Sequence, residues 1–169
     1  ENGTHVLMGS HLGSYRDGET TLAHRVVGRL GAGMLCLADR QFFAYGLWQQ
    51  ARATGADLLW RVKKNLRLPC RQRLTDGSYL SIVYPSERDR RHDTKGVPVR
   101  VIEYTLAGVA DAEDRYRVVT SILDPDQAPA GELAALYHER WEIETALDEL
   151  KTHLRGAKMV LRSKTPDLV

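Results

Sequence analysis

The chain has 169 residues, of which 43% are apolar and 27% are charged, and its formal net charge is +2. This length and composition fit one domain with a hydrophobic core, or such a domain with an insertion. No apolar run approaches membrane-spanning length and the first residues do not resemble a signal peptide, so we expect a cytoplasmic protein with no membrane partner. The two cysteines, Cys36 and Cys70, stand in unmatched contexts that indicate neither a disulfide framework nor a zinc site.

The first 63 residues alternate between strand-like and helix-like segments. Short apolar runs such as "GMLCLA" and "ADLLWRVK" are typical of buried strands, and a helical spacing of apolar residues separates them. We predict strands at 4–15, 33–38 and 56–63, with helices at 20–30 and 41–55. This alternation predicts an α/β fold with a largely parallel sheet.

The pattern changes after residue 64. The "DG" pair at Asp76 and Gly77 lies between extended runs and predicts a hairpin, and alternating valines at 97–101 predict a half-buried strand. A further strand is expected at 116–123, and the polar segment 86–96 reads as a mobile loop. We therefore predict a first core segment at 1–63, an antiparallel β insertion at 64–125, and a second core segment at 126–169.

One long helix is expected from Pro129 to about Leu154, with an apolar stripe that includes Leu136. Beside that stripe, four polar residues fall within an arc of roughly 60° on the helical wheel. They are Tyr137, Arg140, Glu144 and Lys151. This second stripe should be half buried at the edge of a cleft. It could be a solvated ion-pair face, or one wall of a site that handles metal and phosphate.

Asp39 stands just past the carboxyl end of a predicted buried strand, which is where ligands sit in open α/β sheets. A second carboxylate from a packed helix could converge with it and bind Mg²⁺ through hard oxygen ligands. The alternative is that Asp39 pairs with Arg40 or caps the following helix.

Basic residues cluster in segment 61–73, which carries six of them and no acidic residue. Arg61, Lys63 and Lys64 begin this cluster. Such a cluster suits a polyanion such as DNA, although many basic stretches are only solvated surface.

The spacing Tyr137-x2-Arg140-x3-Glu144-x6-Lys151 resembles the signature of DDE transposases of the insertion-sequence-4 group. "LYHERWEIETALDELKTHLRG", "GMLCLADRQFF" and "GADLLWRVKKNLRLP" are similar to the same family, so the resemblance covers essentially the whole chain. It implies a ribonuclease-H-like core, interrupted by the β insertion, in a nucleoid-associated enzyme that cuts and rejoins DNA at transposon ends.

The resemblance also implies roles for individual residues. Asp39 matches the second catalytic aspartate and Glu144 the catalytic glutamate, so both would be ligands of Mg²⁺ or Mn²⁺, with two ions in the intact protein. Tyr137, Arg140 and Lys151 match positions that hold DNA phosphates. Tyr116 is the candidate for an aromatic residue that stacks on a flipped base, with the alternative that it simply packs on the sheet.

One position of the family pattern is missing. No residue in 1–38 matches the first catalytic aspartate, and Asp17 stands in a turn. We therefore expect that aspartate upstream of Glu1, and we expect a fragment with little strand transfer of its own, although the intact protein would act as a homodimer on transposon ends and target DNA. The alternative is a non-catalytic remnant that binds DNA or a transposase partner.

Overall fold

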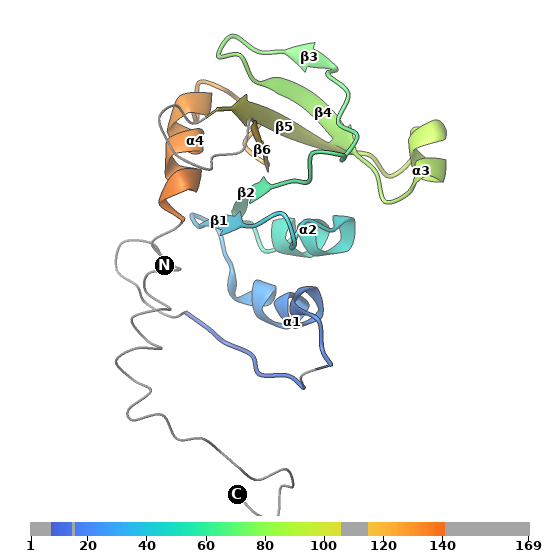
Figure 1. The fold of residues 1–169 in the computed structure, drawn as a ribbon, viewed down its shortest axis with the longest axis vertical. Helices are drawn as coiled ribbons and strands as arrows, with labels where there is room; N and C mark the ends of the chain where they lie inside the picture. Colours follow the sequence, from blue (N-terminus) through green and yellow to red (C-terminus); the bar gives the residue numbers. More distant parts are fainter. Residues whose placement is uncertain (1–7, 15, 106–114, 141–169) are drawn as a thin grey trace, which may run out of the picture. The chain divides into compact units, whose positions relative to one another are not determined.

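The computed structural model describes residues 8–14, 16–105 and 115–140 (Figure 1). Residues 7–138 form one compact unit, and residues 1–6 with 139–169 form a second, of which only 139 and 140 are described. Predictions that concern residues 1–7, 15, 106–114 and 141–169 lie outside the described residues. None of the described helices is both long and apolar enough to cross a membrane.

The fold is mixed α/β, as the sequence predicts, and its strands form one six-stranded sheet with the order β1-β2-β6-β5-β4-β3. The elements in chain order are α1 (Glu19–Val26), the short 3-10 helix η1 (Val27–Arg29), β1 (Leu35–Ala38), α2 (Tyr45–Arg52), β2 (Asp57–Arg61), β3 (Gln72–Arg73), β4 (Tyr79–Val83), α3 (Glu87–Arg91), β5 (Val97–Tyr104), β6 (Tyr116–Thr120) and α4 (Ala130–Glu139).

The prediction of a largely parallel sheet is wrong for the described strands. Only β1 and β2 pair in parallel, and every other neighbouring pair is antiparallel. The reason is β6, which returns from the predicted insertion and pairs antiparallel with β2, with Trp60 opposite Val119. The strands predicted as an insertion are therefore continuous with the sheet that β1 and β2 begin. The predicted boundaries at 63 and 125 stay a prediction.

One face of the sheet is covered by α2 and packs through aromatic rings. Trp48 of α2 and Trp60 of β2 are each 1% exposed, and their rings meet edge to face with centroids 5.2 Å apart. Phe43, just before α2, adds a second edge contact to Trp60 at 6.4 Å. Each of these rings buries a large apolar area, so this face carries the main hydrophobic core.

The opposite face is covered by α4 (Figure 1). Leu133 and Tyr137, one turn apart on the helix, are each 4% exposed and pack against Leu59, Ile102 and Val118 of the sheet. Alternation along β2 explains the two cores, since Leu59 points to α4 while its neighbour Trp60 points to α2. The buried face of α4 thus runs through Leu133 and Tyr137.

Three further expectations are corrected. Residues 8–14, which belong to the predicted first strand, do not form a strand. Segment 86–96, expected to be a mobile loop, contains α3, whose N-cap Ser86 accepts a hydrogen bond from the Asp89 amide. The middle of strand β5 is buried on both faces, because Arg100 and Ile102 are as buried as Val99 and Val101.

The predicted hairpin and the predicted start of the last helix agree with the structure. The hairpin at Asp76–Gly77 joins β3 to β4, and Gly77 adopts φ +84°, a conformation that favours glycine. Strand β3 is short, and both of its residues are exposed at the edge of the described sheet. Helix α4 begins where expected, but the rest of the predicted long helix, residues 141–154, lies outside the described residues.

Candidate functional site

Asp39 follows directly after β1 and begins a turn in which the Phe42 amide donates to the Asp39 carbonyl at 3.0 Å. Within the described part of the chain, its Oδ1 atom is buried and has no hydrogen-bond partner. Helix α2 starts several residues later, at N-cap Ala44, without a side-chain cap, so the alternative that Asp39 caps α2 is wrong. A buried carboxylate oxygen without a partner is costly unless a cation pairs with it. Asp39 therefore fits a hard metal ion such as Mg²⁺.

Tyr137 contacts the last residue of β1, which directly precedes Asp39. Its hydroxyl donates to the carbonyl of Ala38 at 3.2 Å, and the residue is 4% exposed. The expectation that Tyr137 is half buried at a cleft edge is wrong, because its ring belongs to the core between α4 and the sheet. The contact joins the first residue of the predicted signature to the residue that precedes Asp39.

Helix α4 is held at its other end by a cluster of buried polar groups, which we call the Arg100 cluster. Arg100 of β5 is fully buried, and its guanidinium forms an ion pair with Asp76 of the hairpin. Its remaining donors reach Ser78 Oγ at 2.8 Å and the carbonyls of Ala128 at 2.7 Å and Asp124 at 3.2 Å. Asp76 Oδ2 also accepts from the Ala130 amide at 2.9 Å, at the first residue of α4.

These contacts change the acidity of Asp76. Partial burial alone would raise the pKa of this carboxyl, but hydrogen bonds from Ser78 and the Ala130 amide and the charge of Arg100 lower it below its ordinary value of 3.8. The Arg100 cluster thus connects the hairpin, β5 and the start of α4 through an ionised pair. No sequence pattern predicts this cluster, since Arg100 stands at a position of an alternating strand that is typical of a solvent-facing side chain.

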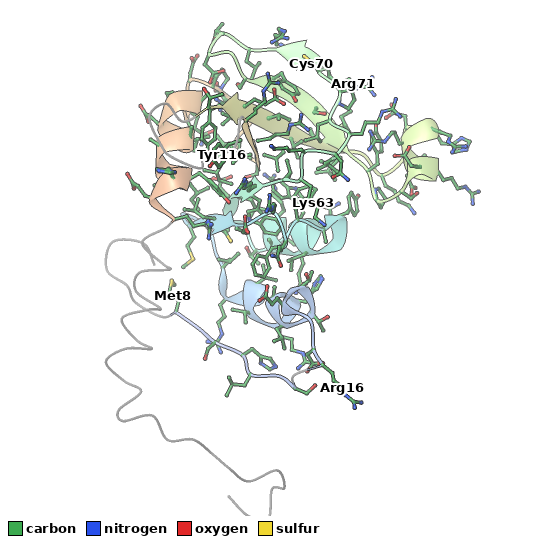
Figure 2. The ribbon with its side chains drawn as sticks, viewed as in Figure 1. Met8, Arg16, Lys63, Cys70, Arg71 and Tyr116 are labelled. Carbon is green, nitrogen blue, oxygen red and sulfur yellow. The ribbon has the colours of Figure 1, made fainter. Side chains whose placement is uncertain are left out.

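The predicted base-stacking residue Tyr116 already has neighbours within the sheet. Its ring stacks on that of Tyr104, the cross-strand partner on β5, with centroids 5.4 Å apart and planes inclined by 14°. Figure 2 labels Tyr116 on the sheet. The guanidinium of Arg61 lies 4.7 Å from the centre of the Tyr116 ring. The alternative that Tyr116 packs on the sheet is therefore well supported, and its contact with a DNA base stays a prediction.

The basic segment after β2 is anchored to the sheet by Arg117 of β6. Arg117 donates to the Lys64 carbonyl at 3.4 Å and the Leu66 carbonyl at 3.1 Å, and it pairs with Glu103 at 2.7 Å. Arg117 thus holds the backbone of this segment while Lys63 and Lys64 remain exposed.

Glu103 also affects Tyr79 of β4. Burial, together with the nearby Glu103 carboxylate, raises the pKa of Tyr79 to about 12.

The remaining predicted residues are only partly accounted for. Arg140 is half buried, whereas Glu144 and Lys151 lie outside the described residues. No group of three histidine, cysteine or acidic side chains that could hold a metal ion occurs among residues 8–14, 16–105 and 115–140. Cys36 is half buried, with its thiol pKa raised by burial, and Cys70 is exposed; neither is in a disulfide.

Comparison with known proteins identifies the family. The model of the family described as "Transposase DDE domain" matches residues 1–165. The chain belongs to the DDE transposases. It is 27% identical, over an alignment of 171 positions, to the transposase InsG for insertion sequence element IS4 of Escherichia coli (strain K12). This alignment covers 98% of the chain and 38% of that relative, so the DDE transposase chain spans well under half of the relative's length. The predicted resemblance to the insertion-sequence-4 group is confirmed.

Proposed function

We propose that this DDE transposase chain carries part of a catalytic centre that cleaves DNA at transposon ends and joins the freed end to target DNA. The observation that carries the proposal is the hydrogen bond from Tyr137 to the carbonyl of Ala38. It joins α4, which leads into the transposase signature, to the end of β1, where Asp39 has a buried carboxylate oxygen without a partner. Helical spacing from Tyr137 would place Glu144 two turns further along on the same face.

In this proposal, Asp39 and Glu144 are the two metal ligands that the chain supplies. When Mg²⁺ or Mn²⁺ is bound, it polarises a phosphodiester and makes a water or a 3′-hydroxyl a stronger nucleophile. Asp39 would provide its Oδ1 atom, which is already desolvated. The first aspartate of the family pattern, which no residue in 1–38 matches, would complete the set.

The other predicted residues would bind and orient DNA. Arg140 and Lys151 would pair with phosphates near the scissile bond, and the exposed Lys63 and Lys64 would contact the backbone farther along. Because these contacts release counterions, DNA affinity should fall steeply as salt rises. Tyr137, whose hydroxyl is bonded to Ala38, would act by placing the helix as well as through any phosphate contact. Two copies of the intact protein would handle the two transposon ends together.

The test is a DNA cleavage assay on the full-length protein, with DNA that carries the ends of its own element. Asp39→Asn and Glu144→Gln should each abolish cleavage and leave DNA affinity unchanged, because both remove a metal ligand without removing a phosphate contact. Asp126→Asn is the matched control, since Asp126 is exposed on the loop before α4 and should retain full cleavage.

Calorimetric titration with Mn²⁺ separates the proposal from its rival. Loss of Mn²⁺ binding in Asp39→Asn supports the catalytic centre. Metal binding that survives this substitution, together with no cleavage by the unsubstituted protein, would favour a non-catalytic remnant that only binds DNA or a partner.

A further inference from the structure

A hollow of about 300 Å³ opens between the turn after β1, the segment after β2, and α3. Four cationic side chains line it, together with one carboxylate and an aromatic ring. They are Arg40, Lys63, Arg67, Arg90, Glu87 and Phe43. We call this feature the basic hollow. Its volume is at the lower end of the range for small-ligand sites, but the surplus of positive charge selects for an anionic group.

Arg90 forms a fixed part of this wall. Its side chain is 17% exposed, donates to the Arg67 carbonyl at 3.0 Å and pairs with Glu87 at 3.4 Å. The Tyr84 ring lies 5.7 Å from its guanidinium and further restricts it. Glu87, the single acidic residue among the lining side chains, is 62% exposed and lies beside Arg90, so it offsets the charge of only one of the four cations.

Lys63 and Arg67 are the available cations of the basic hollow. Both residues are exposed, and within the described residues their side chains have no hydrogen-bond or ion-pair partner. Their backbone is nevertheless fixed, because the Leu66 amide donates to the Lys63 carbonyl at 3.0 Å and Arg90 binds the Arg67 carbonyl. Two cations on an anchored segment can pair with an anion without a further cost for ordering the backbone.

The basic hollow lies at the same end of the sheet as Asp39. Strands β1 and β2 are parallel, with Ala38 opposite Trp60, so the residues that follow the two strands emerge together. Arg40 directly follows Asp39, and Lys63 follows β2 by two positions. A strand of DNA whose scissile phosphate lies at Asp39 would therefore pass this hollow.

We propose that the basic hollow binds backbone phosphates of duplex DNA beside the cleavage point, with Arg67 and Arg90 as contacts that the transposase signature does not include. The proposal rests on the proposed function for the identity of the ligand. It adds α3 to the DNA-binding surface, so that a helix inserted between β4 and β5 contributes to positioning the substrate.

The experiment measures binding of fluorescently labelled duplex DNA to the full-length protein by anisotropy, without divalent metal, at several salt concentrations. Lys63→Gln combined with Arg67→Gln should lower the affinity about tenfold near 0.1 M salt and reduce the slope of log affinity against log salt by about 2. Arg90→Gln should lower the affinity less. Its thermal unfolding is measured in parallel, because Arg90 also binds the Arg67 carbonyl.

The matched control is Arg88→Gln combined with Arg91→Gln. Both arginines are exposed on α3 outside the basic hollow, and the pair removes the same charge. Affinity within about twofold of the unsubstituted protein is expected for this control, since diffuse charge contributes little at this salt concentration. Equal losses in the two double variants, or no loss in the first, would overturn the basic hollow as a site. Because the assay contains no metal, it is independent of whether Asp39→Asn abolishes cleavage.

Discussion

The helices on the two faces of the sheet are held by different balances of interaction. Against α2, most of the contact is aromatic, between the rings of Trp48, Trp60 and Phe43. Two hydrogen bonds are added at the ends of α2, from the Tyr45 hydroxyl to the Lys95 carbonyl at 2.6 Å and from Arg52 to the Ser121 carbonyl at 3.3 Å. Against α4, the apolar contact is smaller, and directed hydrogen bonds hold the helix at both ends: the Arg100 cluster at its first residue and the Tyr137 hydroxyl near its last.

This difference agrees with the roles that the proposed function gives to the two helices. Apolar burial is not directional, so a helix held mainly by it can shift slightly at small cost. Hydrogen bonds and buried ion pairs have narrow geometry and fix register and orientation. Under the proposed function, α4 leads to a carboxylate that must bind the same metal ion as Asp39 and would need that restriction, whereas α2 would only cover the sheet. Variants on the two faces should therefore separate stability from activity.

Trp60→Ala should have the largest effect on stability. Removing a ring that is 1% exposed from the α2 face should cost about 3–5 kcal/mol in the free energy of unfolding. Chemical denaturation measures it. The molecules that remain folded should cleave DNA normally. A loss of cleavage per folded molecule would contradict the expectation that the α2 face affects stability alone.

Arg100→Met should cost about 3 kcal/mol, because it leaves Asp76 partly buried without its charge partner. Unlike Trp60→Ala, this change should also lower cleavage at temperatures where the protein is fully folded. It removes the bond from Arg100 to the Ala128 carbonyl before α4, and it leaves Asp76, the acceptor for the Ala130 amide, without its charge partner. Cleavage per folded molecule, with the folded fraction from circular dichroism, is the measurement. Full activity in the folded variant would show that the Arg100 cluster only stabilises the fold.

Tyr137→Phe should cost only about 1 kcal/mol of stability, the usual value of one neutral hydrogen bond. The ring stays in the core, so the effect on cleavage reports the bond to the Ala38 carbonyl. We expect a decrease in kcat with little change in KM for DNA. An increase in KM alone would instead indicate that the hydroxyl contacts DNA.

The smallest effect should appear in the dependence of stability on pH. The lowered pKa of Asp76 means that the folded state favours its ionised form, so this contribution is present above pH 3.8 and is lost as pH falls through the lower folded-state pKa. Asp76→Asn should therefore reduce the loss of Tm on acidification in that window. Asp126→Asn, which changes an exposed carboxyl, should follow the unsubstituted protein.

The sequence predicted the elements whose signals are local. Apolar runs located β1 and β2, and the Asp76–Gly77 turn located the hairpin, because buried strands and tight turns are determined by their own residues. The pairing of β6 with β2 was not predicted, since it joins segments separated by more than fifty positions. The missed helix α3 did have a signal, the capping residue Ser86, within a segment judged only by its polarity.

The site could be predicted only in part for a similar reason. Asp39 was found from its place after a buried strand, and the family was found from the spacing that begins at Tyr137. Neither pattern reveals that the Tyr137 ring is buried, or that Arg100 occupies a buried position. Both depend on partners far away in the chain, and an arginine in an alternating strand normally indicates a solvent-facing side.

The short edge strand β3 has a consequence for solubility. A sheet margin with exposed backbone groups invites strands of neighbouring molecules to add to it, but β3 offers only two residues, and one of them is Arg73. Brevity and positive charge together discourage two copies from joining edge to edge. The same arginine is attractive to nucleic acid, so a margin that repels other copies of the protein remains open to a polyanion.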